Sequence, residues 1–145
     1  MKIVAKWNEK LSLTASADAH SVVMDSKPPL GSDAGMTPKQ LVAAGLCGCT
    51  AMDVIALMKK HKQPLESFEI EADVAMTEGS HPIVFKSVLL TFKLAGALDQ
   101  ARVIESVQLS QTKFCGVSAM LSKAVPINYV VELNGQKIAE GVAKF

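Results

Sequence analysis

Three cysteines, Cys47, Cys49 and Cys115, are the residues of this sequence with the clearest capacity for chemistry. A thiolate can act as a nucleophile or a redox group, and a helix N-terminus or a nearby cation favours its formation. Cys115 comes directly before a short helical pattern and close to Lys113, so we expect its thiolate to be favoured. Cys49 lies about three turns inside a predicted helix, so a cation from elsewhere in the fold would have to activate it.

The helix that carries Cys49 is the strongest structural signal in the chain and spans residues 37–60. Its start is well marked, because Thr37 can cap the helix, Pro38 suits the first helical position and Gln40 completes a capping box. The run that follows is almost entirely apolar, which predicts a core helix buried on several sides. A membrane span needs about 20 apolar residues with few or no charges, and Asp53 and the lysines that follow argue against one.

The two cysteines of this helix point to nearly opposite faces, because a helix turns by about 100° per residue and they are two residues apart. Cys47 shares its face with alanine, valine and methionine, as a small buried hydrophobe would. Cys49 shares its face with Gly45 and Asp53, which leaves room for another group to approach. We therefore expect Cys49 to be the reactive thiol of the two, although inert packing of both stays an alternative. No third ligand stands at metal-binding spacing, so we predict no metal site.

Composition excludes several classes of function. The 145 residues are 49% hydrophobic and 20% charged, which predicts a single globular domain over residues 1–145. The net charge is +1 and there is no basic block, so we expect no nucleic-acid partner. An odd number of cysteines does not suit a disulfide scaffold. The N-terminus reads as an amphipathic strand and not as a signal peptide, which predicts a cytoplasmic protein without a membrane partner.

The remaining chain divides into strands and two further helical patterns, which together predict an α+β fold with antiparallel sheet. The expected strands span residues 2–8, 11–18, 22–24, 65–77, 83–94, 127–133 and 137–144, and the expected helices span residues 98–114 and 115–121. Phe114 falls on the inward stripe of the first of these helices. Asn134-Gly135 supplies the turn of the last hairpin.

Two blocks of residues around the cysteines together resemble the OsmC/Ohr family, named for osmotically inducible and organic hydroperoxide resistance proteins. The blocks are Thr37-Pro38-x-Gln40-Leu41 with Gly48-Cys49-Thr50-Ala51-Met52-Asp53, and Phe114-Cys115-x-Val117-Ser118-x-Met120-Leu121. The resemblance covers nearly the whole chain and implies an OsmC-like fold, with antiparallel sheets around a long central helix in an intertwined homodimer.

The resemblance also implies a thiol peroxidase that needs no cofactor. Cys49 would attack a small organic hydroperoxide and become a sulfenic acid, and Cys115 would condense with it to form a disulfide. An external dithiol would then reduce that disulfide. The alternative is a non-catalytic OsmC-like dimer that responds to oxidation or binds an apolar ligand.

The sequence departs from the hydroperoxide-reducing branch at the groups that activate the thiolate. That branch uses an arginine from an N-terminal strand, paired with a glutamate just before the cysteine helix. Here Arg102 is the only arginine and lies far along the chain, and Lys39 occupies the position that matches the glutamate. We take Lys39 as a candidate electrostatic helper of Cys49, and Asp53, one turn after Cys49, as a further candidate site residue.

Overall fold

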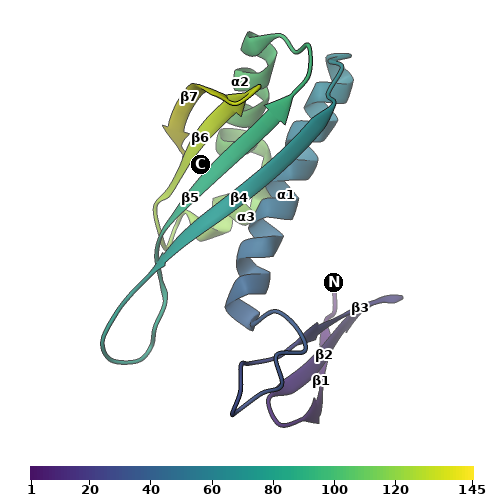
Figure 1. Cartoon of the computed structure of the whole chain (residues 1–145), viewed down its shortest axis with the longest axis vertical. Coiled ribbons are helices and arrows are strands. Elements are labelled where there is room, and N and C mark those ends of the chain that lie inside the picture. Colours follow the sequence, from purple (N-terminus) through teal and green to yellow (C-terminus); the bar gives the residue numbers. More distant parts are fainter. The chain divides into compact units, whose positions relative to one another are not determined.

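The computed structural model describes all residues, 1–145, as two compact units, Met1–Ala43 and Ala44–Phe145 (Figure 1). The boundary between them falls inside helix α1 (Pro38–Lys60). The chain contains two sheets and one long helix, which confirms the predicted α+β class. That the chain forms a single domain stays a prediction.

The first unit holds a three-stranded antiparallel meander with the strand order β1-β2-β3. Its strands are β1 (Val4–Glu9), β2 (Ser12–Ala17) and β3 (His20–Met24). The two turns contain Lys10 and Asp18, both with positive φ angles. The predicted N-terminal hairpin and third strand are confirmed, with β3 beginning two residues earlier than its apolar residues indicated.

The loop after β3 is organised around the buried carboxylate of Asp25. Its oxygens accept hydrogen bonds from the backbone N–H groups of Ser26 (2.7 Å), Ser32 (3.0 Å) and Ala34 (3.1 Å). These bonds lower the pKa of Asp25 because they stabilise its charged form. Gly31 passes so close that a Cβ there would lie 2.0 Å from the carbonyl oxygen of Ser26, so a side chain cannot fit without displacing the loop.

Helix α1 begins where the capping residues predicted. The backbone N–H of Thr37 donates to Oε1 of Gln40 (2.8 Å), and the N–H of Gln40 donates to Oγ1 of Thr37 (3.4 Å). These reciprocal bonds form a capping box and satisfy two donors that the first turn would otherwise leave open.

The buried surface of α1 is narrower than the apolar composition of the helix predicted. One stripe at four-residue spacing is buried, and it consists of Leu46, Thr50, Val54 and Met58. Val42 and Met52 are exposed, so the prediction of a helix buried on several sides is wrong for the single chain. By length and composition α1 could span a membrane, and 22% of its most apolar window is buried. Core helices of soluble proteins also meet that criterion, so it is weak evidence for a span.

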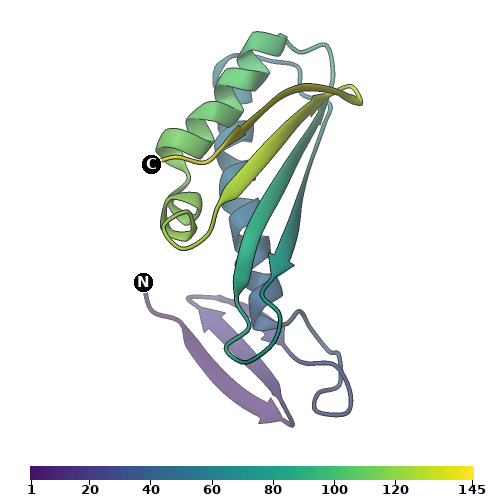
Figure 2. The ribbon, with the colours of Figure 1, turned by 90° about the vertical axis from the view of Figure 1, so that its left-hand side faces the viewer.

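The second unit contains a four-stranded sheet with the order β4-β5-β6-β7. Its strands are β4 (Ser67–Met76), β5 (Phe85–Ala95), β6 (Ile127–Leu133) and β7 (Gln136–Val142). Both hairpins are antiparallel as predicted, but β5 and β6 pair in parallel, which corrects the expectation of purely antiparallel sheets. A parallel pair needs a crossover connection, and here the shorter helices form it. In Figure 2 the helices lie on one face of this sheet.

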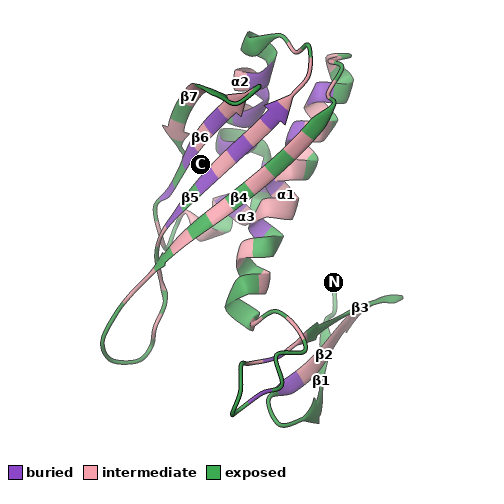
Figure 3. Cartoon of the chain, in the orientation of Figure 1, coloured by how far each residue is buried: buried purple, intermediate pink, exposed green.

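The core of the second unit lies between that sheet face and the helices. Buried residues alternate with less buried ones along β5 and β6 (Figure 3). Phe92 is fully buried, and the ring of Tyr129 meets it edge-on with 6.2 Å between centroids. The Tyr129 ring also covers Gly141 of β7, where a Cβ would lie 2.4 Å from the phenolic oxygen.

The crossover between β5 and β6 contains a helix that ends in a π-helical turn. The elements of the crossover are α2 (Gln100–Leu109), the π-helical turn η1 (Ser110–Phe114) and α3 (Gly116–Leu121). The N–H of Cys115 donates to the carbonyl of Ser110 (3.0 Å), an i→i−5 bond that adds one residue to the turn. The buried stripe therefore passes to Cys115, and Phe114 is 47% exposed. The prediction of an inward Phe114 on a regular helix over residues 98–114 is wrong for this reason.

Candidate functional site: two interacting thiols

Cys49 and Cys115 lie close enough for their thiols to interact. Cys49 is on α1 and is half-buried, whereas Cys115 is the N-cap residue of α3 and has no exposed surface. The two side chains come from segments that are far apart in the sequence. The fold thus brings together the two cysteines that the sequence analysis selected.

The surroundings of Cys115 favour its protonated form. Burial raises the pKa of the Cys115 thiol, and the neighbouring Cys49 raises it further. The hydrogen bond from the N–H of Ser118 to the Cys115 sulfur (3.3 Å) acts in the opposite direction but does not prevail. Cys115 does lie at the start of a helix as predicted, but the expectation that this position favours its thiolate is wrong, because burial outweighs the N-terminal position.

Asp53 follows Cys49 by four residues and so lies on the same side of α1. Its Oδ2 accepts a hydrogen bond from Oγ of Ser110 (3.0 Å), the first residue of the π turn. Partial burial raises the pKa of the Asp53 carboxyl, while the bond from Ser110 lowers it by a smaller amount. Asp53 therefore joins the Cys49 helix to the segment that leads to Cys115.

A buried polar network continues from this contact, and the sequence analysis did not identify it. The hydroxyls of Thr50 and Ser110 are 2.8 Å apart and share a hydrogen bond. The amide nitrogen of Gln111 donates to Oγ1 of Thr50, and Oγ of Ser118 donates to Oε1 of Gln111 (3.2 Å). Thr50, Ser110, Gln111 and Ser118 are all fully buried. The signal in the sequence was the polar run at residues 110–112, which interrupts an otherwise amphipathic helix next to Cys115.

The other candidate side chains lie apart from the thiol pair. Cys47 packs against the hydrophobic core, and burial raises the pKa of its thiol. Lys39 is in the first turn of α1, nearly three turns before Cys49. The guanidinium of Arg102 forms an exposed ion pair with Glu105 (2.7 Å) on α2. The assistance of Lys39 to Cys49 stays a prediction.

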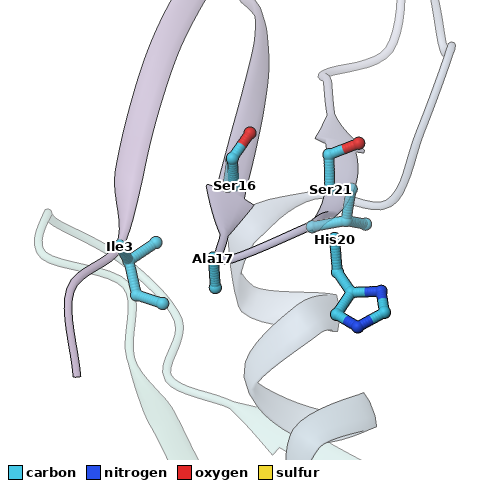
Figure 4. Close-up of a pocket in the computed structure, with 7 residues that line it drawn as sticks. Ile3, Ser16, Ala17, His20 and Ser21 are labelled. Atoms are coloured by element: carbon cyan, nitrogen blue, oxygen red, sulfur yellow. The ribbon is translucent and has the colours of Figure 1, made fainter.

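A shallow pocket of about 220 Å³ lies in the first unit, on the meander (Figure 4). Its lining is mostly apolar and includes Ile3, Ala17 and His20. His20 is the one titratable side chain in the lining, so the pocket offers no second group for acid–base chemistry. No cluster of three or more histidine, cysteine, aspartate or glutamate side chains in the chain is placed to hold a metal ion.

Two interacting thiols, one on a long helix and one buried within a helical crossover, define an α+β protein with a two-cysteine site. A family model described as OsmC-like protein matches residues 31–130. Protein YhfA of Escherichia coli K12 is 33% identical over 135 residues, which cover 92% of this chain and 98% of that protein. The chain therefore belongs to the OsmC-like protein family, which confirms the resemblance seen in the sequence.

Solved structures show the same fold. The crystal structure of an OsmC-like protein from Mycoplasma pneumoniae aligns with a TM-score of 0.80 at 18% identity, over 91% of this chain and 95% of that chain. An organic hydroperoxide resistance protein from Legionella pneumophila aligns with a TM-score of 0.68 at 20% identity, over 90% and 95%. The arrangement of two sheets and a long cysteine-bearing helix is thus the OsmC-like fold.

Proposed function

We propose that this protein is a thiol-dependent peroxidase that reduces organic hydroperoxides with Cys49 and Cys115. The observation that carries the proposal is the interaction between these two thiols, which start on distant segments of the chain. The fold shared with the organic hydroperoxide resistance protein of Legionella pneumophila supports the choice of substrate class. The reaction uses only the protein's own thiols and an external dithiol.

The cycle balances with these groups. The Cys49 thiolate attacks the terminal peroxide oxygen, the O–O bond breaks, and the alkoxide leaves and takes up a proton as the alcohol. Cys49 is oxidised to a sulfenic acid. The Cys115 sulfur then attacks the Cys49 sulfur and releases water, which leaves a Cys49–Cys115 disulfide. A small dithiol reduces this disulfide by two exchange steps and is itself oxidised.

The different surroundings of the two thiols support this division of roles. Cys49 is half-buried and accessible to a small substrate, whereas Cys115 has no exposed surface and is held in the protonated state by burial. A peroxide therefore meets Cys49 first. Cys115 reacts only with a sulfur that is already beside it.

Asp53 and Lys39 have supporting roles in this proposal. Asp53 holds Ser110, the residue that opens the π turn before Cys115. Lys39 is our candidate for the cation that favours the Cys49 thiolate.

We further propose that the protein acts as a cytoplasmic homodimer without membrane or nucleic-acid partners. Helix α1 buries only one stripe in the single chain, and Met52 on it is 74% exposed. Exposed apolar surface on a long helix is typical of a subunit interface. Three free cysteines suit a reducing compartment.

A second candidate function is a non-catalytic dimer that senses oxidation or binds an apolar ligand. The observation that favours it is the engagement of the only arginine, Arg102, with Glu105 on α2. An arginine held there leaves the thiolate without the guanidinium that the hydroperoxide-reducing branch uses. In this function the Cys49–Cys115 pair would oxidise once and would not turn over.

The experiment that separates these functions is the consumption of cumene hydroperoxide by the purified protein with dithiothreitol or a dihydrolipoyl system. We expect many turnovers for the unmodified protein and none for Cys49→Ser. Cys115→Ser should retain a single rapid reduction, and Cys47→Ser is the matched control that should keep full activity. Loss of one peroxide equivalent per chain, without turnover, would refute the peroxidase and support the sensing function.

A further inference from the structure

Gln111 is an unusual residue for the core of a small protein. Its side chain has no exposed surface, yet it carries a polar amide. The amide nitrogen donates to Oγ1 of Thr50 and more weakly to Oγ of Ser110 (3.4 Å), and the amide oxygen accepts from Oγ of Ser118 (3.2 Å). The Gln111 backbone carbonyl accepts from the N–H of Lys144 (3.0 Å). Both ends of the residue are therefore fixed.

Two of the hydroxyls that hold the amide belong to the two cysteine-bearing segments. Thr50 is the residue next to Cys49 on α1. Ser118 is in α3, and its N–H donates to the sulfur of Cys115 (3.3 Å). A single side chain thus connects the neighbour of one thiol to the hydrogen-bond donor of the other.

Gln111 lies near the start of the π turn, on the buried side of the crossover. It continues the four-residue spacing of the buried Val103 and Val107, and the additional residue of the π turn then directs Cys115 inward in place of Phe114. An apolar side chain of similar length would fill the same space without any polar group to satisfy. Packing alone therefore does not require an amide at this position.

We propose that Gln111 is a positioning residue that sets the approach of Cys115 to Cys49. It touches neither substrate nor a reacting atom, and it acts by fixing α1 and α3 relative to each other through Thr50 and Ser118. The inference deepens the proposed function, because it assumes that the two thiols form a disulfide. It does not depend on the identity of the oxidant.

The test compares Gln111→Met, which keeps the length of the side chain and removes the amide, with Gln108→Met. Gln108 is an exposed glutamine one turn earlier on α2, and no hydrogen bond of its side chain is present in the structure. Each variant is equilibrated with reduced and oxidised dithiothreitol, and the Cys49–Cys115 disulfide is quantified by alkylation and peptide mass spectrometry. A second measurement traps the Cys49 sulfenic acid with dimedone after one equivalent of cumene hydroperoxide.

We expect Gln111→Met to shift the equilibrium toward the dithiol by at least about tenfold, because a disulfide held away from its preferred geometry is strained and more easily reduced. The share of Cys49 trapped by dimedone should rise, and Gln108→Met should match the unmodified protein. Gln111→Glu keeps the length and an acceptor for Ser118, so it should restore part of the disulfide. It also provides the comparison if Gln111→Met does not fold, as judged by circular dichroism.

The outcomes separate this inference from the proposed function. A disulfide in the redox buffer that Gln111→Met destabilises and Gln108→Met does not, without turnover of peroxide, would refute the peroxidase and support the role of Gln111. The positioning role would be overturned if the disulfide were equally stable in Gln111→Met and Gln108→Met. If Gln111→Met does not fold, equal disulfide stability in Gln111→Glu and the unmodified protein would overturn it. Absence of a Cys49–Cys115 disulfide in the unmodified protein would overturn both.

Discussion

The burial of Cys115 predicts how the second half of the proposed thiol cycle depends on pH. If the thiolate is the attacking species, the rate follows the thiolate fraction. An ordinary cysteine with a pKa of about 8.5 gains about threefold in thiolate between pH 8 and pH 9. Burial raises the pKa of Cys115, so its gain over the same interval should be larger and approach tenfold.

The assay uses 5,5′-dithiobis(2-nitrobenzoate) on a Cys47→Ser background, so that only Cys49 and Cys115 are present. The accessible Cys49 reacts first and releases one thionitrobenzoate. Cys115 then attacks the mixed disulfide within the same chain and releases a second one, which is followed by absorbance. Burial is the largest cause of the raised pKa of Cys115, and it does not depend on the charge of Cys49. Adding Cys115→Ser should abolish the second release at every pH.

A gain of threefold or less in the second rate, or a plateau reached before pH 8.5, would refute the reasoning that burial controls Cys115. Circular dichroism at pH 8 and pH 9 checks that the fold is unchanged over the interval.

Three further predictions concern the elements that support the site. Thr50→Val removes the hydroxyl that Gln111 and Ser110 share, so it should lower the free energy of unfolding by about 1–3 kcal/mol. Thr50→Ser keeps a hydroxyl and should lose less. Both are measured by unfolding in urea at one fixed protein concentration. Gly141→Ala drives a methyl group into the ring of Tyr129 and should cost about 1–3 kcal/mol in the same assay; an unchanged midpoint would contradict the contact. The lowered pKa of Asp25 means that its carboxylate stabilises the fold above the ordinary carboxyl pKa and that this contribution is lost as the pH falls through the lowered value. Acid unfolding of Asp25→Asn should therefore depend less on pH than that of the unmodified protein.

Local signals in the sequence were sufficient for much of the fold. The capping box of Thr37 and Gln40 set the start of α1, and strict alternation predicted β4 as a strand with one polar face. Asn134-Gly135 marked the last turn, where both residues have positive φ. These features depend on neighbours in the chain, so a single sequence contains them.

The errors have long-range causes. The parallel pairing of β5 with β6 depends on where a crossover returns to the sheet, and no local pattern encodes that choice. The π turn inserts one residue into a helix without any change in the apolar period before it, so Phe114 was placed inward. The sequence also did not indicate that Cys115 is fully buried, so the direction of its pKa shift could not be predicted. The polar network around Gln111 joins the crossover to Thr50 of α1, about 60 residues away, so no local pattern could predict it.

The parallel pairing also has a consequence for the order of events when the chain folds. Val88 of β5 pairs with Ile127 of β6, so the crossover that carries Cys115 is closed only when two distant segments of the chain meet. Contacts of high sequence separation form slowly, whereas a helix such as α1 forms within about a microsecond. In a nascent chain Cys49 therefore has Cys47 as its nearest thiol long before Cys115 arrives. The opposite faces of α1 keep those two sulfurs apart once the helix exists, so early helix formation would protect the proposed Cys49–Cys115 pairing against a premature Cys47–Cys49 one.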